Sequence, residues 1–278
     1  MNTEPTILDT IAAATVQRVE EAKNQVPLEQ VRAAASDLNA DTGYPFDQAL
    51  RGPDIAFICE CKQASPSKGL IAADYPYVDI ARSYQEAGAH AISVLTEPQW
   101  FKGSPQHLKD IAATVTIPVL RKDFVVDPYQ IYEAKVLGAS AILLICSLLS
   151  DDQLAHFHSL ARGLGLSALV EAHNQVEIER ALIAGASIIG VNNRDLRDFT
   201  VEPGRAASLR EMVPADVAFV AESGISTPLQ VDTLRATGVN AVLVGETLMR
   251  ASDRRGMLDY LRGASTLSPR TPDSGDPA

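Results

Sequence analysis

Short apolar runs alternate with amphipathic, helix-length segments along most of the chain. Four of the runs directly follow a glycine, in "GAHAISVL", "GASAILLI", "GASIIGVN" and "GVNAVLVG", which begin at Gly88, Gly138, Gly185 and Gly238. A glycine after a helical segment is typical of a left-handed helix cap, and the apolar run behind it predicts a buried strand. Four further apolar runs, at 55–59, 118–121, 167–170 and 217–221, bring the predicted strands to eight.

The segments between these runs have the length and pattern of helices. They span 78–87, 105–115, 128–137, 151–164, 175–184, 203–213 and 228–237, and several begin with proline, which is favoured in the first turn of a helix. Strands that are apolar on both faces and alternate with helices predict a parallel sheet covered by helices. Eight such units predict an α/β protein with a closed (β/α)8 TIM barrel. A doubly wound open sheet is the alternative, but no Gly-x-Gly-x-x-Gly follows the first strand.

Two parts of the chain lie outside the predicted barrel. Residues 7–35 have a helical pattern that Pro27 interrupts, so we expect residues 1–50 to form a helical extension. It would pack across one end of the barrel or join the rim of the site, and residues 51–263 would form the catalytic barrel. The final stretch, 264–278, is rich in Ser, Pro, Gly and Asp and has little to bury, which predicts a disordered tail.

Composition restricts the partners of this protein. Its 278 residues are 46% hydrophobic, and 24 Lys and Arg stand against 35 Asp and Glu. This negative surface repels nucleic acid and acidic membranes, so an anionic ligand needs a local binding site. The first residues lack the basic and apolar regions of a signal peptide, and no apolar run reaches the length of a membrane span. Three cysteines do not suggest a disulfide framework, and we expect a cytoplasmic protein.

Charged and polar residues gather where the predicted strands end, and in a TIM barrel these ends share one opening. They are Glu60 and Lys62, Lys122 and Asp123, Glu171, Asn192 with Asn193 and Arg194, Glu222 and Ser223, and Gly245 and Glu246. Loops are polar in any protein, so one such residue is weak evidence. Acids and bases at several strand ends together predict an active site. Glu60 and Lys62 point to the same side of an extended strand, with Cys59 and Cys61 on the other side, where we expect small apolar fillers and no metal site.

Two glycine turns near the end of the chain predict a phosphate site. "AESGIS" follows the seventh predicted strand and "LVGETL" contains the end of the eighth. Each places a small turn before an expected helix start, where backbone N–H groups and the helix dipole favour an anion. The loops after strands seven and eight are the usual phosphate site of this architecture. A tight turn needs glycine in any case, so the pair of turns carries more weight than either one alone.

The motifs together resemble a known family. "ECKQASPSKG", "SVLTEPQWFKGS", "VLRKDF", "LVEAHN", "GVNNRDL", "AESGI" and "LVGETLM" are similar, in order and spacing, to those of indole-3-glycerol phosphate synthase of tryptophan biosynthesis. The resemblance extends from about Ile7 to Leu261. It implies a carboxy-lyase that closes the pyrrole ring of 1-(2-carboxyphenylamino)-1-deoxyribulose 5-phosphate with loss of carbon dioxide and water. It also implies that no cofactor or metal is used, and we expect a monomer.

The resemblance assigns roles to individual residues. Lys122 becomes the general acid that protonates the ribulose carbonyl, and Glu171 the base for the later dehydration. Lys62 would bind the substrate carboxylate or act as a second acid, and Glu60 would hold this lysine and a sugar hydroxyl. Asn192 joins the catalytic group, Ser65, Phe124, Arg194 and Glu222 bind the substrate, and Ser223, Gly224, Gly245 and Glu246 bind its phosphate. We expect Lys62 and a dry pocket to lower the pKa of Lys122 toward neutrality.

Two positions depart from the family pattern, and the roles of three residues stay ambiguous. Cys61 stands where the family usually has an aliphatic residue, and Gln63 stands where it usually has a lysine, which removes a charge beside the loop that contains Ser65. His173 follows Glu171 by two residues and can face the site, although a structural role is favoured. Trp100 and Phe101, in the loop after the second predicted strand, can serve equally as a lid over an aromatic substrate or as loop packing.

Alternative functions remain at this point. A phosphoribosylanthranilate isomerase-like barrel would use a cysteine and an aspartate, such as Cys59 or Cys61 with Asp195, but would leave Lys122 and Glu171 without a role. An orotidine phosphate decarboxylase would show Asp-x-Lys-x-x-Asp, whereas Ser65 stands three residues after Lys62. A non-catalytic barrel that binds a phosphate ligand would have no need for acids and bases that face each other.

Overall fold

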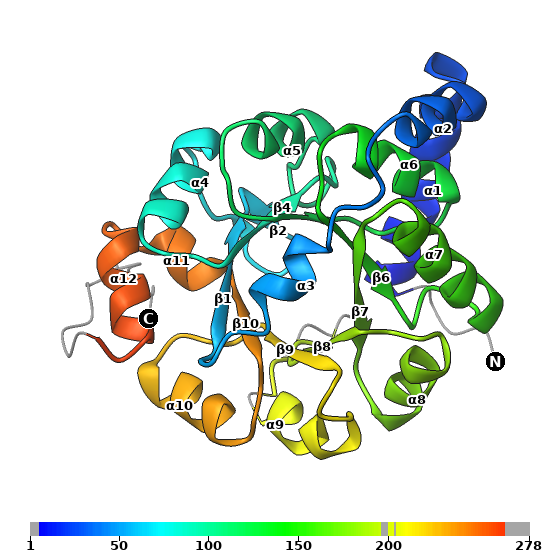
Figure 1. Cartoon of the computed structure of the whole chain (residues 1–278). Helices are drawn as coiled ribbons and strands as arrows, with labels where there is room; N and C mark the ends of the chain where they lie inside the picture. Colours follow the sequence, from blue (N-terminus) through cyan, green and yellow to red (C-terminus); the bar gives the residue numbers. More distant parts are fainter. Residues whose placement is uncertain (1–5, 196–199, 203, 265–278) are drawn as a thin grey trace.

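The computed structural model describes residues 6–195, 200–202 and 204–264. In it, eight parallel strands close into one barrel in the order β1-β10-β9-β8-β7-β6-β5-β4, around which the helices lie (Figure 1). The strands are β1 (Ala56–Cys61), β4 (Ala91–Leu95), β5 (Val119–Lys122), β6 (Ala141–Ile145), β7 (Ser167–Ala172), β8 (Ile188–Asn192), β9 (Ala218–Glu222) and β10 (Ala241–Val244). The barrel closes because β1 pairs with β4 on one side and with β10 on the other. The predicted TIM barrel is therefore confirmed, and the open sheet is excluded.

Most of the predicted outer helices begin and end close to their expected bounds, whereas the last two helices of the outer layer had no predicted bounds. They are α4 (Tyr77–Glu86), α5 (Pro105–Ala112), α6 (Pro128–Val136), α7 (Asp151–Gly163), α8 (Gln175–Ile183), α9 (Arg205–Leu209), α10 (Pro228–Ala236), α11 (Glu246–Arg250) and α12 (Arg254–Leu261). Side chains of Ser104, Asp127, Ser150 and Thr227 cap the N-termini of α5, α6, α7 and α10. The segment predicted as a helix at 203–213 forms the short α9 and a 3-10 turn at Arg210–Met212, and its first residue lies outside the described residues.

In its described part, residues 6–50, the N-terminal extension forms three helices. α1 (Ile7–Gln25) and α2 (Leu28–Ser36) are separated at Pro27, as the sequence predicted, and α2 packs against α6. α3 (Pro45–Ala49) was not predicted, and it lies across the end of the barrel that faces the viewer in Figure 1. Its Phe46 is fully buried in the cluster that fills the barrel interior. Leu8 and Ile11 of α1 also pack in that cluster, so the extension contributes to the barrel core itself.

Two apolar clusters hold the barrel together, and they follow the alternation of strand side chains. The inner cluster includes Ile58, Leu120, Leu169 and Val220 and fills the barrel, whereas a larger outer cluster lies between strands and helices. Cys59 and Cys61 belong to the outer cluster and are fully buried, so their predicted orientation is confirmed.

Other small elements had no signal in the sequence. A hairpin of β2 (Ala64–Ser65) and β3 (Gly69–Leu70) follows β1, and its strands are only two residues long. No described helix has both the length and the apolarity to span a membrane. The predicted tail lies outside the described residues except for Ala264.

Candidate active site

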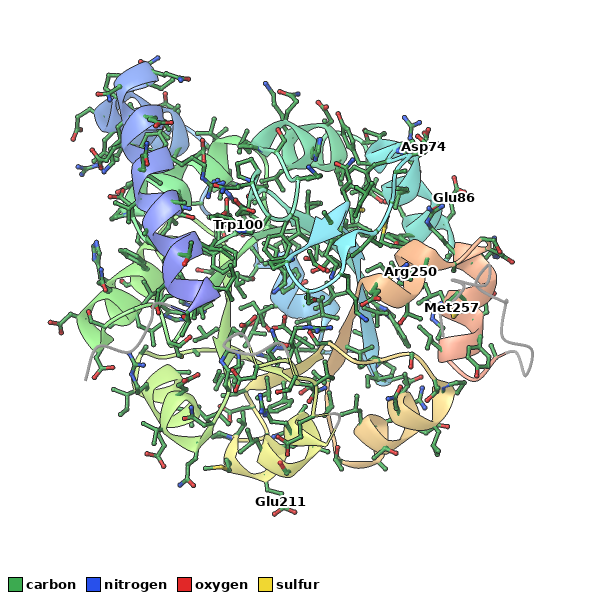
Figure 2. The ribbon with its side chains drawn as sticks, turned by 180° about the vertical axis from the view of Figure 1, so that it is seen from behind. Asp74, Glu86, Trp100, Glu211, Arg250 and Met257 are labelled. Carbon is green, nitrogen blue, oxygen red and sulfur yellow. The ribbon has the colours of Figure 1, made fainter. Side chains whose placement is uncertain are left out.

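The carboxyl ends of the strands surround a cavity of about 490 Å³. Apart from Asn193, every residue that the sequence predicted for the site lines this cavity, from Glu60 on β1 to Glu246 after β10. Figure 2 shows the molecule from this side, with α1 in front and the β2–β3 hairpin near the centre. Several strands extend one or two residues beyond their predicted ends. The added residues include Glu171 and Glu222, whose side chains line the cavity.

Lys122 lies at the centre of a charged cluster at the cavity floor. Its Nζ is 3.1 Å from Oε2 of Glu222 and 3.4 Å from Oε2 of Glu171. Both carboxylates are 1% exposed, and the lysine side chain is 15% exposed. The three residues come from β5, β7 and β9, so the barrel geometry alone brings them together. An ammonium group in such a dry site can neutralise negative charge that develops on a ligand.

Glu60 and Lys62 form a second pair, with Nζ 2.6 Å from Oε1. Gly245 lies directly beside this pair. A Cβ atom at this position would collide with the Glu60 carboxylate and would lie 3.0 Å from Lys62 Nζ. The backbone of Gly245 has a negative φ of −115°, so the glycine is needed for the close approach and not for its conformational freedom.

The pKa of Lys122 is shifted in the direction opposite to the one expected from the sequence. Burial acts to lower the pKa of Lys122, but the carboxylates of Glu222, Glu171 and Glu60 outweigh it and raise the pKa above its ordinary value. The expectation of a lowered pKa was therefore wrong for the ligand-free protein, since Lys62 pairs with Glu60 and the carboxylates nearest Lys122 are those of Glu171 and Glu222. Burial also raises the pKa of Glu222 to about 7, although Lys122 opposes this shift.

The two predicted phosphate turns lie side by side, since β9 and β10 are paired. Ser223 and Gly224 both have a positive φ, at 65° and 75°. Helix α10 begins only at Pro228, so the first turn does not directly precede a helix as predicted. Gly245 immediately precedes α11, whose first N–H groups have no acceptor within the helix. Backbone N–H groups from both turns can therefore face one anion.

The carboxylate of Glu246 is engaged with cations. It lies 3.1 Å from Nε of Arg250, one turn further along α11, and 3.9 Å from Nζ of Lys68 in the loop of the β2–β3 hairpin. A phosphate would be repelled by this carboxylate, so only the backbone of Glu246 suits the predicted role. Arg250, labelled in Figure 2, also lines the cavity and was not predicted from the sequence.

Asn192 and Arg194 close the side of the cavity at the end of β8. The Asn192 side chain accepts a hydrogen bond from the N–H of Arg194 at 3.0 Å, which fixes the start of this loop. Asn193 points elsewhere: it donates to the carbonyl of Ser223 and accepts from the N–H of Ala206. Asn193 therefore ties the ends of β8 and β9 together and is not a member of the site.

A buried network fixes the segment that contains Lys122. Asp123 accepts hydrogen bonds from Arg18 of α1 at 2.7 Å and from Thr96 at 2.6 Å. Arg121, on the helix-facing side of β5, is 2.7 Å from Glu133 and 3.3 Å from Asp123. The extension thus reaches the strand end beside Lys122, a contact that the sequence pattern could not indicate.

Aromatic and aliphatic side chains form the rest of the wall. Phe101 and Phe124 line the cavity with ring centroids 6.0 Å apart, over aliphatic residues that include Leu143 and Ile145. Glu97 accepts hydrogen bonds from the N–H groups of Trp100 and Phe101, which holds this loop in place. Trp100 is half-buried against the inner cluster and does not line the cavity, so loop packing describes it better than a lid.

Comparison with known proteins matches this chain to one family. A family model described as indole-3-glycerol phosphate synthase matches residues 8–261. A protein of that name from Ruminiclostridium cellulolyticum is 53% identical over 259 residues, which cover 93% of this chain and 100% of the relative. The chain belongs to the indole-3-glycerol phosphate synthase family. A second relative of the same name, from Endomicrobium trichonymphae, is 54% identical and covers 89% of this chain and 96% of its own.

A solved structure outside the indole-3-glycerol phosphate synthase family shares the fold. The thiamine phosphate pyrophosphorylase from Pyrococcus furiosus has a TM-score of 0.58 and 18% sequence identity, and the match covers 78% of this chain and 96% of that one. At this identity the likeness concerns the barrel alone. Family membership disfavours the isomerase-like alternative, and so does the outward position of Cys59 and Cys61.

Proposed function

We propose that this chain catalyses the reaction named by its family, which converts 1-(2-carboxyphenylamino)-1-deoxyribulose 5-phosphate to indole-3-glycerol phosphate with release of carbon dioxide and water. Family membership supports the activity. The observation that supports the mechanism is the position of Lys122 between the buried carboxylates of Glu171 and Glu222 on the floor of the cavity. The described residues of the cavity supply acid and base groups at its floor, which suit a reaction that proceeds by proton transfers.

Lys122 is the general acid of the first step. The ring carbon that carries the carboxylate attacks the ketone carbon, a carbon–carbon bond forms, and the carbonyl oxygen takes a proton from Lys122. Because the neighbouring carboxylates raise the pKa of Lys122, the amine is protonated when the substrate arrives. A general acid that is too weak transfers its proton late, so substrate binding must also change the surroundings of Lys122. The negative charge of the bound substrate favours uptake of a proton from solvent by the neighbouring Glu222, whose pKa burial already raises to about 7.

Carbon dioxide leaves next, and its bonding electrons stay with the ring. Glu171 then removes the proton from the carbon next to the new hydroxyl, and the hydroxyl departs as water with a proton from the acid. The substrate carboxylate carries a negative charge and carbon dioxide carries none, so each turnover consumes one proton from solvent. Glu171 and Lys122 are in contact, which lets the proton taken by the base be returned to the acid.

The other residues hold the substrate. Lys62 pairs with Glu60 in the free protein and can turn to the substrate carboxylate, since its side chain is 17% exposed at the cavity. Phe124 and Phe101 face the anthranilate ring, and Ser65, Asn192, Arg194 and Glu222 orient the chain of the sugar. Backbone N–H groups of Ser223, Gly224, Gly245 and Glu246 bind the phosphate. We also propose that the protein is a cytoplasmic monomer that requires no metal.

A direct assay tests this proposal. The purified protein is mixed with 1-(2-carboxyphenylamino)-1-deoxyribulose 5-phosphate, and the fluorescence of the indole product is followed. The expected result is saturable formation of indole-3-glycerol phosphate without added metal and in the presence of a chelator. Phosphoribosylanthranilate serves as the alternative substrate. Isomerisation of that compound, with no indole formed from the first, would contradict the proposed function and favour the isomerase-like alternative.

A further inference from the structure

His173 lies directly behind the proposed base. It follows β7 immediately, two residues after Glu171, so the two side chains lie on the same side of the extended chain. Its Nε2 is 3.5 Å from Oε1 of Glu171, whereas Lys122 contacts the other oxygen, Oε2, at 3.4 Å. Each carboxylate oxygen therefore faces one nitrogen, but Oε1 of Glu171 and Nε2 of His173 form no hydrogen bond at 3.5 Å, and both atoms are buried without a hydrogen-bond partner among the described residues. The mechanism described above uses only the Lys122 side.

Glu177 fixes the orientation of the imidazole. Its Oε2 accepts a hydrogen bond from the backbone N–H of His173 at 2.8 Å and lies 3.2 Å from Nδ1 of the ring. The other oxygen, Oε1, accepts from the side chain of Asn174 at 3.0 Å, and Asn174 caps α8. Both carboxylate oxygens of Glu177 are thus engaged, so the first turn of α8 is a rigid support for the ring.

This orientation decides which proton the imidazole can exchange. With Nδ1–H donated to Glu177, a neutral ring presents the lone pair of Nε2 to Glu171. A single proton can then lie on Oε1 of Glu171 or on Nε2 of His173. The charged groups that face the ring are the carboxylates of Glu171 on β7, Glu177 on α8 and Glu222 on β9. Burial acts to lower the pKa of His173, but these three carboxylates outweigh it and raise the pKa, which favours the imidazolium form.

Exposure increases along this line of residues. The Glu171 side chain is 1% exposed, while those of His173 and Glu177 are each 14% exposed. When substrate fills the cavity, the open side of Glu171 is covered by the ligand, and His173 and Glu177 offer a connection to solvent that does not cross it. Such a connection is useful because each turnover consumes one proton.

We infer that His173, oriented by Glu177, is a positioning residue for Glu171 and exchanges protons between this carboxylate and solvent. The inference rests on the proposed role of Glu171 as the base. In the outward direction the proton moves from Oε1 of Glu171 to Nε2 of His173, while the proton on Nδ1 passes to Oε2 of Glu177 and then to water. The inward direction, which supplies the proton that the reaction consumes, reverses these transfers. These steps transfer protons only, and no group is oxidised, reduced or released.

Three variants test the inference. His173→Ala should lower kcat roughly 10-fold or more, because Glu171 loses the group that orients it, while KM changes little. Added imidazole should restore part of kcat in this variant, since the cavity left by the ring lies between Glu171 and Glu177. Glu177→Gln should lower kcat less, because the amide keeps a hydrogen bond to the loop. His156→Ala, at an exposed position of α7, is the matched control and should be neutral in the presence and absence of imidazole.

The pH profile and a double variant separate a chemical role from a structural one. In His173→Ala the pH profile of kcat should differ from that of the wild type near neutral pH. The double variant His173→Ala with Glu171→Gln should lose no more kcat than Glu171→Gln alone. Wild-type kcat in His173→Ala, a loss that imidazole does not relieve, or independent losses in the double variant would each overturn the inference. If Glu171→Gln itself turned over like the wild type, the proposed role of the base would fail together with the inference. Loss of activity in Glu171→Gln with a wild-type His173→Ala would instead leave the proposed function intact.

Discussion

Replacing Glu222 by Gln should make the stability of the protein less dependent on pH. Burial raises the pKa of Glu222 to about 7 in the folded protein, against an ordinary value of 4.5. A raised folded-state pKa means that its stabilising contribution is fully present below about pH 4.5 and is lost as the pH rises through about 7. Each pKa unit corresponds to about 1.4 kcal/mol, so the complete loss is about 3 kcal/mol. The glutamine variant has no such group and should lack this loss.

Most of this loss of stability falls within a pH range in which the protein can be measured. About 2 kcal/mol of the loss falls between pH 5 and pH 8, because the unfolded chain already ionises near pH 4.5. For a chain of this size, 1 kcal/mol corresponds to roughly 2–4 °C in Tm. The Tm of Glu222→Gln relative to wild type should therefore increase by about 4–8 °C between pH 5 and pH 8. Differential scanning calorimetry on the ligand-free protein measures this difference directly.

A surface glutamate provides the control for this experiment. Glu86 is exposed on α4, at the edge of the molecule in Figure 2, and Glu86→Gln should show the same Tm difference from wild type at both pH values. If the Tm difference between Glu222→Gln and wild type were also constant from pH 5 to pH 8, Glu222 would not titrate as the structure indicates. The account of the charged cluster around Lys122 would then be wrong.

Three further changes probe the phosphate turns, the N-terminal extension and the tail. Gly245→Asp should raise KM strongly while the variant still folds, because the new carboxylate repels the substrate phosphate and also contacts Glu60. Unchanged substrate binding in the folded variant would place the phosphate elsewhere. Arg18→Gln should destabilise the protein by roughly 2 kcal/mol in denaturant unfolding, because it removes a charged hydrogen bond from the fully buried Asp123, which keeps Arg121 and Thr96 as partners. Arg82→Gln, which breaks an exposed pair, should cost at most about 1 kcal/mol, and equal effects of the two would contradict this reasoning. Deletion of residues 265–278 should leave kcat and Tm unchanged, and a large loss of either would show that the tail is folded.

The barrel could be predicted because its signals are local. A glycine cap before each of four strands and a proline at the start of several helices are visible over a few residues. The short hairpin that contains Ser65 and the five-residue helix α3 have no such signal, since two to five residues show no periodicity. Their positions depend on contacts with distant parts of the chain.

The membership of the site was predictable, but the pairing of its charges was not. Strand ends in a TIM barrel converge, so residues such as Lys122 and Glu171 could be placed in one cavity from their positions alone. Which lysine contacts which carboxylate depends on distances across the barrel. Lys62 contacts Glu60 on its own strand, and Lys122 contacts carboxylates from two other strands, so the effect on the pKa of Lys122 was the reverse of the expectation. The support from Arg18 of α1 likewise depends on packing between elements far apart in sequence.

The most direct test of the mechanism compares the species that accumulate in Lys122→Met and Glu171→Gln. Lys122→Met keeps the bulk of the side chain and removes the acid, so kcat should fall by at least roughly 10²-fold while substrate affinity changes much less. Rapid quench and mass analysis of this variant should find unreacted substrate. Glu171→Gln keeps the shape and loses the base, so a cyclised, decarboxylated and still hydrated intermediate should accumulate. Near wild-type turnover of Lys122→Met would contradict its role as the acid, and the same stalled species in both variants would show that the two residues act in one step.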